Sequence, residues 1–158
     1  VETMTGVGVD AIIPWQASRS IVRWDAARAA KGTTRWRAAA REAAKQARRP
    51  RVPEIAGLET TEQVVARLRS ASGAGLALVL HESATRPLSP TASATVADIV
   101  MVVGPEGGVS DDELAAFEAA GAVAVRLGPT VLRASTAGTV AAAVLLAASG
   151  RWDMPAAT

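Results

Sequence analysis

The 158-residue sequence has no cysteine and no tyrosine, and it contains one phenylalanine and one histidine. The absence of cysteine excludes a disulfide framework and thiolate metal sites. The single histidine, His81, leaves too few ligands for a zinc centre. Because side chains that stack on bases are scarce, any nucleic-acid binding is expected to depend on arginine and lysine.

We also expect no membrane-spanning or targeting segment in this sequence. Residues 134–149 carry no charge, but the stretch is short for a membrane span and begins with small and polar residues, so we expect a buried helix. No signal peptide opens the chain, which leads us to expect a cytosolic protein without a membrane partner. The chain begins inside an expected helix that ends at Gly6 or Gly8, without a cap or a preceding strand. We therefore expect this one-domain chain to be part of a longer protein.

The most informative stretch is Gly-Pro-Glu-Gly-Gly-Val-Ser at residues 104–110. It follows the β-branched run Ile99–Val103, and Ser110 with Glu113 forms the Ser-x-x-Glu pattern of a capping box. The pattern predicts a strand, a tight turn and a helix N-terminus. Glycines there permit positive φ and a close approach of the backbone to a ligand. A strand-to-helix connection without a ligand is the alternative.

Two further apolar runs predict strands that end in polar loops. Residues 76–80 precede His81-Glu82-Ser83, and residues 122–127 precede residues 128–133. Helices expected at residues 61–72, 111–120 and 134–149 alternate with these strands, and we expect residues 99–103 to form the central strand. The alternation predicts an α/β fold with a mainly parallel sheet and helices on both faces, which brings the three loops to one pocket. A hydrogen-bonded loop residue is the alternative for His81.

Two nucleotide-binding patterns are absent from the sequence. The Rossmann fingerprint requires Gly-x-Gly-x-x-Gly early in the fold, and residues 104–108 have different spacing after a late strand. A phosphate-binding Walker loop requires Gly-Lys followed by Ser or Thr, and the chain has no such tripeptide. The glycines of residues 104–108 therefore serve another ligand.

Positive charge is concentrated in a short stretch of a chain whose net charge is only +2. We expect two short strands or extended segments at residues 10–15 and 20–24 around a turn holding Arg19, and a helix at residues 35–47 capped by Thr33 or Thr34 after Gly32. Against one acid, Glu42, residues 28–51 carry nine basic residues: Arg28, Lys31, Arg35, Arg37, Arg41, Lys45, Arg48, Arg49 and Arg51. Such a cluster is typical of a phosphate-binding surface. A solvated helix face and cations at a helix C-terminus are the alternatives.

The motifs together resemble the ribosomal RNA small-subunit methyltransferase E family of the SPOUT superfamily. The resemblance covers nearly the whole chain. Its motifs are Gly8 to Pro14, Arg19-Ser20, Gln46, Arg49, Arg51 to Ile55, Val103 to Ser110, Arg126 to Pro129, Val131-Leu132-Arg133 and Thr136-Ala137. Members of this family methylate N3 of a uridine in 16S ribosomal RNA with S-adenosylmethionine.

The resemblance implies several properties of the whole molecule. It implies a SPOUT-type α/β knot with a deep C-terminal trefoil, a homodimer that completes each active site, and a substrate in the small ribosomal subunit. It identifies residues 1–158 as a catalytic domain that lacks the family's N-terminal PUA-like RNA-binding domain and first strand. A noncatalytic RNA-binding or ribosome-assembly module with the same fold, and a SPOUT methyltransferase acting on another RNA, are the alternatives.

The resemblance also implies roles for individual residues. The cofactor-binding set is Leu80, His81, Glu82, Val103, Gly104, Pro105, Glu106, Gly107, Gly108, Leu127, Gly128, Val131, Leu132 and Arg133. Arg133 would stabilise negative charge on the base, and Glu106 and His81 are the available general bases. The expected RNA contacts are Arg19, Arg48, Arg49 and Arg51. The chain departs from the family at Ser135, where many relatives have Glu, and at Arg48, where Gly is usual.

Overall fold

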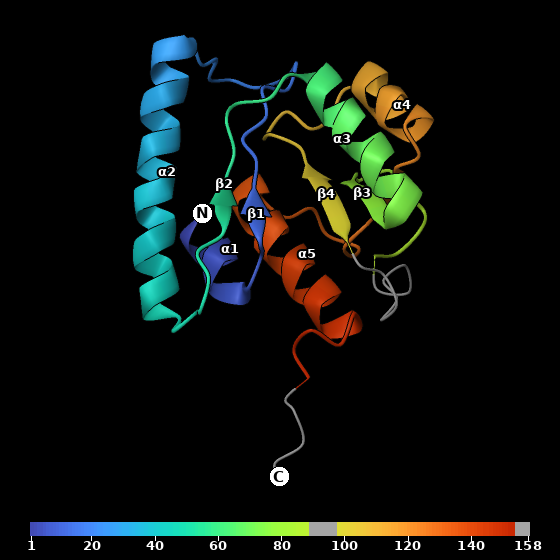
Figure 1. Cartoon of the computed structure of the whole chain (residues 1–158). Coiled ribbons are helices and arrows are strands. Elements are labelled where there is room, and N and C mark those ends of the chain that lie inside the picture. Colours follow the sequence, from blue (N-terminus) through green and yellow to red (C-terminus); the bar gives the residue numbers. More distant parts are fainter. Residues whose placement is uncertain (89–97, 154–158) are drawn as a thin grey trace.

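The computed structural model describes residues 1–88 and 98–153, and it alternates helices with short strands (Figure 1). In chain order the elements are α1 (Glu2–Val7), β1 (Ala11–Ile12), α2 (Ala26–Gln46), β2 (Glu54–Ile55), α3 (Thr61–Ala74), β3 (Leu76–Leu80), β4 (Ile99–Val103), α4 (Asp111–Ala119), β5 (Val123–Val125) and α5 (Ala134–Ala148). The expected loop at residues 86–95 lies mostly outside the described residues, because only 86–88 are described.

All strand pairs in the described residues are parallel. β1 pairs with β2, and β3 lies between β4 and β5 in a second sheet. The mainly parallel sheet is thus confirmed. The expectation that β4 is the central strand is wrong, because β3 has that place. Both runs are equally apolar in sequence, whereas in the structure β3 buries three consecutive residues and β4 buries one.

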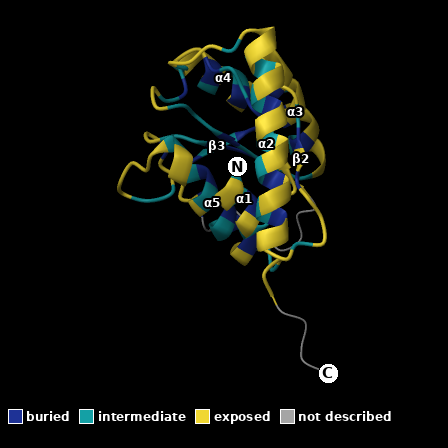
Figure 2. Ribbon diagram, turned by 90° about the vertical axis from the view of Figure 1, so that its left-hand side faces the viewer, coloured by how far each residue is buried: buried dark blue, intermediate teal, exposed yellow. Residues whose placement is uncertain are grey.

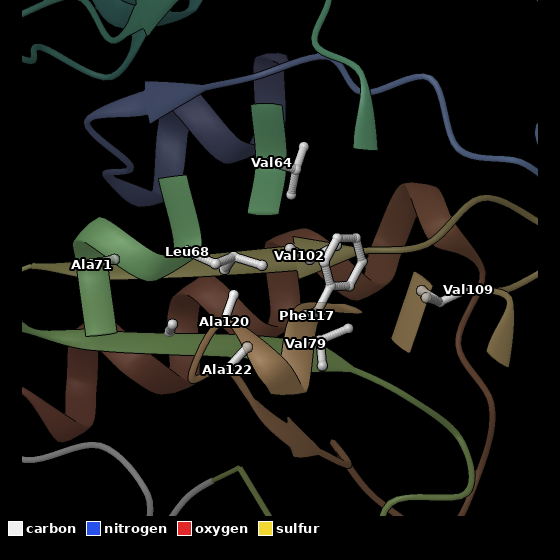
Figure 3. Packing of buried hydrophobic residues seen from close by; sticks show 10 residues of the cluster. Val64, Leu68, Ala71, Val79, Val102, Val109, Phe117, Ala120 and Ala122 are labelled. Atoms are coloured by element: carbon white, nitrogen blue, oxygen red, sulfur yellow. The ribbon is translucent and has the colours of Figure 1, made fainter. Parts of the chain in front are cut away.

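Helices α3 and α4 cover one face of the three-stranded sheet. Leu68 of α3, Phe117 of α4 and Val79 of β3 belong to one buried cluster, and Figure 3 shows the Phe117 ring among these side chains. Trp15 packs edge-on against Phe117 with ring centroids 5.4 Å apart. This contact attaches the segment after β1 to the α3–α4 layer.

Helix α5 covers the opposite face of the same sheet. Leu145 and Ala141 of α5 are buried with Leu78 of β3 and Val125 of β5. Helix α1 packs against α5, where a Cβ at Gly138 would lie 3.6 Å from the sulfur of Met4. The predicted arrangement of helices on both faces is confirmed, and apolar burial on each face stabilises it.

Helix α2 is longer than the sequence predicted. It begins at Ala26, where the Asp25 carboxylate accepts a 2.8 Å hydrogen bond from the Arg28 backbone N–H, and the predicted start at residue 35 is wrong. Gly32 lies inside α2, where its missing side chain leaves room for the Trp24 ring. A Cβ at this position would lie 2.5 Å from that ring. Thr33 acts inside the helix, where its hydroxyl donates to the Ala29 carbonyl. Gly32 therefore allows Trp24 to pack against α2, and Thr33 forms a hydrogen bond within the helix, so neither residue marks a helix boundary.

Residues 20–24 form no strand, and within residues 10–15 the strand covers Ala11–Ile12, with a single bridge at Trp15. Ile21 and Val22 are 81% and 64% exposed, so these two apolar side chains do not pack into the core. The Gln16 side chain binds this segment instead, accepting from the Trp24 backbone N–H at 2.9 Å. The segment forms an irregular loop over the N-terminal end of α2.

Candidate functional site

The three predicted ligand loops, here named the strand-end loops (residues 81–83, 104–110 and 127–133), begin at the same edge of the sheet. Leu80, Val103 and Val125 are register partners at the C-terminal ends of β3, β4 and β5. The His81 backbone N–H donates to the Val125 carbonyl at 3.0 Å, which extends the pairing one residue beyond β3. The prediction that parallel order brings these strand ends together is therefore confirmed, and this edge is where open α/β sheets bind ligands.

The glycine loop, residues 104–110, is a tight turn with different demands at each glycine. The Gly108 backbone N–H donates to the Pro105 carbonyl at 2.8 Å, and Gly108 has a φ of +75°, which favours glycine. Gly107 has no positive φ, but a Cβ there would lie 2.9 Å from the Arg19 carbonyl oxygen. Gly107 is therefore required by the close approach of Arg19, a segment of this chain that sequence reasoning did not connect with the loop.

The third loop, residues 127–133, leads into α5 and exposes both apolar and cationic side chains. Val131 is 76% exposed and Leu132 is 37% exposed. Arg133 is the N-cap of α5, and its carbonyl accepts from the Thr136 and Ala137 backbone N–H groups. Its exposed guanidinium has no hydrogen bond or ion pair with the described residues. Arg133 is therefore available to a ligand at the edge of the loop.

The two candidate bases differ in their surroundings. The Nδ1 atom of His81 lies 2.8 Å from the Ser83 hydroxyl and accepts from the Ser83 backbone N–H at 3.3 Å, so this nitrogen is held by its own turn. Glu106 and Glu82 are exposed, and neither carboxylate forms a hydrogen bond or ion pair within the described parts of the chain. Of these groups, the Glu106 carboxylate on the glycine loop is the one with free lone pairs beside Gly107.

A buried carboxylate connects the glycine loop to two distant segments. Glu113, only 5% exposed, accepts from the Ser110 backbone N–H at 3.1 Å and from the Ser110 hydroxyl at 3.0 Å. It also accepts from the backbone N–H of Ser18 at 2.7 Å, from the Ser18 hydroxyl at 2.9 Å, and from the hydroxyl of Thr61 at 3.2 Å. Burial opposes ionisation of Glu113, but the hydrogen bonds from Ser18 and Ser110 outweigh burial and lower the pKa of its carboxyl below the usual value.

The predicted RNA-contact arginines occupy different environments. The Arg49 guanidinium donates to the carbonyls of Thr5, Gly8 and Val9, so it holds the C-terminal end of α1. Arg48 has a φ of +52° after α2, and both it and Arg51 are exposed. Arg19 is exposed as well, and its Nη1 donates to the Val109 carbonyl at 3.3 Å. The structure therefore brings Arg19 to the glycine loop, whereas Arg48 and Arg51 lie at the far end of α2.

A groove runs between α2 and residues 52–58, away from the three strand-end loops. It consists of two hollows of about 490 and 460 Å³ that share Arg37 as a lining residue. Trp24 and Thr33 line one hollow, and Arg41 and Pro53 line the other. Figure 2 shows that the outer side of α2 is exposed along most of its length.

Residues 1–88 and 98–153 contain no group of three or more histidine, aspartate or glutamate side chains that is placed to hold a metal ion. Within the same ranges, no helix combines the length and apolar character needed to cross a membrane.

Comparison with known proteins determines the family. The sequence profile of the RNA methyltransferase domain family matches residues 1–146. The chain belongs to this family. The match spans all three strand-end loops and most of α5, so the methyltransferase domain includes the site described above.

Relatives of this methyltransferase domain extend the identification. The chain is 50% identical over 157 residues to the ribosomal RNA small subunit methyltransferase E of Mycobacterium tuberculosis, covering 99% of this chain and 60% of the relative. The Bacillus subtilis protein of the same name is 31% identical over 144 residues, covering 87% and 55%. The resemblance found in the sequence is confirmed. The chain thus spans about 60% or less of the length of these two relatives.

Solved structures of similar proteins share the fold. A Legionella pneumophila protein classed as a methyltransferase, solved with its cofactor S-adenosylmethionine, aligns with a TM-score of 0.84 at 31% identity, covering 93% of this chain and 60% of that one. The ribosomal RNA small subunit methyltransferase E of Neisseria gonorrhoeae, bound to S-adenosylmethionine, aligns with a TM-score of 0.81 at 29% identity, covering 92% and 58%. The α/β methyltransferase fold of this chain is therefore shared with cofactor-bound relatives.

Proposed function

We propose that this chain is the catalytic domain of a methyltransferase that uses S-adenosylmethionine to methylate N3 of a uridine in 16S ribosomal RNA. The observation that carries the proposal is the meeting of three motif-bearing loops at the C-terminal edge of one parallel sheet. Relatives named for small-subunit ribosomal RNA methylation, and similar structures with bound S-adenosylmethionine, support it.

The strand-end loops have the chemistry that S-adenosylmethionine requires. A Cβ at Gly108 or Gly128 would meet no other atom within 4 Å, so open space adjoins the backbone at both positions. The adjoining side chains of Val131 and Leu132 expose apolar surface. Main-chain N–H and C=O groups of residues 80–82, 103–108, 127, 128 and 131–133 would hold the adenine and methionine parts. The bound cofactor would supply a methyl group activated by its sulfonium.

Three side chains are assigned to the reaction itself. Arg133 has no partner among the described residues, so its charge is free to stabilise the negative charge that uridine develops when N3 loses its proton. The Glu106 carboxylate is the preferred acceptor of that proton because it has free lone pairs. His81 is the second candidate, through Nε2, since Ser83 holds Nδ1.

The RNA surface is assigned to Arg19 and to the groove beside α2. Arg19 lies against the glycine loop, and Arg37 and Arg41 line the groove. Phosphodiester groups are attracted by such exposed cations without sequence specificity. Arg48 and Arg51 extend the basic surface beyond the end of α2, whereas Arg49 is used by the α1 carbonyls and is assigned a structural role.

The assembly follows the family pattern in this proposal. We assign a homodimer, a C-terminal trefoil knot and a cytoplasmic location. Exposed apolar side chains at Val131 and at Val140 of α5 support the dimer, because burial against a second copy would remove them from water. Light scattering from the purified protein measures the mass directly.

The test is the modification state of 16S ribosomal RNA in a strain that lacks the gene for the full-length protein. Mass spectrometry is expected to show the loss of one methyl group at N3 of one uridine, restored by the wild-type gene. Loss of a methyl group from another RNA would identify a SPOUT methyltransferase with a different substrate. Unchanged methylation of all RNA would favour a noncatalytic assembly module and overturn the proposal.

A further inference from the structure

The strongest unassigned feature is the hydrogen-bond cluster formed by Ser18, Thr61, Ser110 and Glu113, here named the Glu113 clasp. Glu113 is the only buried carboxylate among the described residues. A helix-capping role accounts for its bonds with Ser110 alone. The two bonds from Ser18, 95 positions away in the chain, are additional and include the shortest contact of the cluster at 2.7 Å.

The clasp fixes the residue that precedes Arg19. The backbone N–H and the hydroxyl of Ser18 both donate to Glu113. These two hydrogen bonds fix the position of the backbone immediately before Arg19. Arg19 then makes two contacts with the glycine loop: its carbonyl oxygen packs over Gly107, and its Nη1 donates to the Val109 carbonyl. The cationic side chain of Arg19 is thereby held beside the glycine loop, whereas the Glu113 side chain is buried.

Thr61 extends the clasp to the α3–α4 layer. Its hydroxyl donates to Glu113 and accepts a 3.3 Å hydrogen bond from the Trp15 indole. The Trp15 ring in turn contacts Phe117, which has no exposed surface. The position of Ser18 is therefore tied to rigid core elements, as precise placement of a functional side chain requires.

We infer that the Glu113 clasp is a positioning device that holds Arg19 over the glycine loop so that its guanidinium engages a phosphate of the RNA substrate. Glu113 and Ser18 are positioning residues that touch neither the RNA nor the cofactor. This inference rests on the proposed RNA methyltransferase function. It goes beyond that function by assigning a task to a carboxylate and a serine that the reaction itself does not use.

The test compares Ser18→Ala with Ser18→Thr in the full-length protein, using small ribosomal subunits as substrate. Ser18→Ala is expected to raise both the KM for the subunits and their Kd without cofactor by roughly tenfold, the size expected for loss of a hydrogen bond to a charged group. The value of kcat and the Kd for S-adenosylmethionine should change less than about threefold. Ser18→Thr keeps the hydroxyl and should restore the KM.

Two controls separate positioning from simple destabilisation. Thr60→Ala removes a matched hydroxyl cap from α3 that has no contact with Glu113, and it should leave the KM for subunits unchanged. In an Arg19→Ala background, Ser18→Ala should have no further effect, because a residue that acts only through Arg19 gives fully non-additive changes.

The outcomes distinguish failure of this inference from failure of the proposed methyltransferase function. A normal KM for Ser18→Ala, or an equal loss in the Arg19→Ala background, overturns the clasp while wild-type methylation remains intact. Absence of methyl transfer by the wild-type protein overturns the proposed function instead. In that case the subunit Kd values still test whether the clasp positions Arg19.

Discussion

At the scale of single residues, Arg133 carries the most direct catalytic prediction. Replacement by Ala is expected to lower kcat about 100-fold, because an electrostatic partner of the developing charge is removed, while cofactor affinity changes little. Single-turnover methyl transfer with radiolabelled S-adenosylmethionine measures the chemical step. Arg133→Lys should retain part of the rate because it keeps the charge.

A matched arginine provides the control for that prediction. Arg69 is exposed on α3, and its side chain has no partner among the described residues. Arg69→Ala should transfer methyl groups at the wild-type rate. Equal rates for the Arg133→Ala and wild-type proteins would remove Arg133 from the mechanism.

Gly107 provides a prediction about stability. Gly107→Ala is expected to lower the free energy of unfolding by about 1 to 3 kcal/mol, because the new Cβ meets the rigid backbone of Arg19. Gly73→Ala in α3 is the control: its Cβ meets nothing within 4 Å, and it should stabilise the protein by about 1 kcal/mol. Chemical denaturation measures both values. Similar stability of the two variants would contradict the close contact between Arg19 and the glycine loop.

The sequence predicted some of these residue environments and missed others for a physical reason. The Ser110-x-x-Glu113 pattern is local, so it predicted the cap. The bonds from Ser18 to Glu113 join residues 95 positions apart and leave no periodic signal. Gly107 was attributed to ligand approach, because a sequence does not reveal that a distant backbone occupies the same space.

At the scale of elements, apolar runs with capping signals were predicted well. β3, β4, α3 and α4 begin and end within two residues of the predicted positions. The predicted start of helix α2 lies nine residues too late because Gly32 and two threonines normally indicate a boundary. The packing of Trp24 on Gly32 reverses that preference, and only the tertiary structure reveals it.

The length of α2 matters because it presents the basic groove. Arg41→Glu is expected to raise the Kd for small-subunit RNA by about 3- to 10-fold. It should also reduce the magnitude of the slope of log affinity against log salt by about 1, as for loss of a phosphate contact. Filter binding over a range of salt concentrations measures both quantities.

Arg69→Glu is the control for the groove, since it makes the same change in net charge on an exposed helix elsewhere. Its RNA affinity and salt slope should stay close to those of the wild-type protein. If the two reversals weaken binding equally, net charge alone explains the effect and the groove has no special role.

At the scale of the whole molecule, Glu113 links stability to pH. Its pKa is lower in the folded chain than the usual value of 4.5, so the unfolded state binds more protons when the pH is acidic. The stabilisation is therefore fully present above about pH 4.5 and is lost as the pH falls through the lower pKa of the folded state. The free energy of unfolding, measured between pH 3 and 7, should fall less steeply with acid in Glu113→Gln than in the wild type.

A second carboxyl group also makes the stability sensitive to acid. Comparing the wild type with Glu113→Gln cancels its contribution. Asp10 also has a lowered pKa, through its hydrogen bond with Arg151, and it contributes equally to the wild type and to Glu113→Gln. The difference between the two proteins isolates Glu113. Parallel curves would show that the Glu113 carboxyl is not stabilised in its ionised form.

The α/β architecture with parallel strands was predicted from alternating apolar runs, and the family from motifs that lie at one edge of the sheet. Strand order was not predicted, because it depends on which runs pair in space. We propose that this edge of the sheet is where a methyl group is transferred to ribosomal RNA.

Transfer of radiolabelled methyl from S-adenosylmethionine by the full-length protein tests that claim most directly. Small ribosomal subunits from a strain lacking the gene serve as substrate, and wild-type subunits serve as the control. We expect close to one methyl group per deficient subunit, located at N3 of a uridine in 16S ribosomal RNA, and almost none in the control. A folded protein that binds the subunits but transfers no methyl group would contradict it.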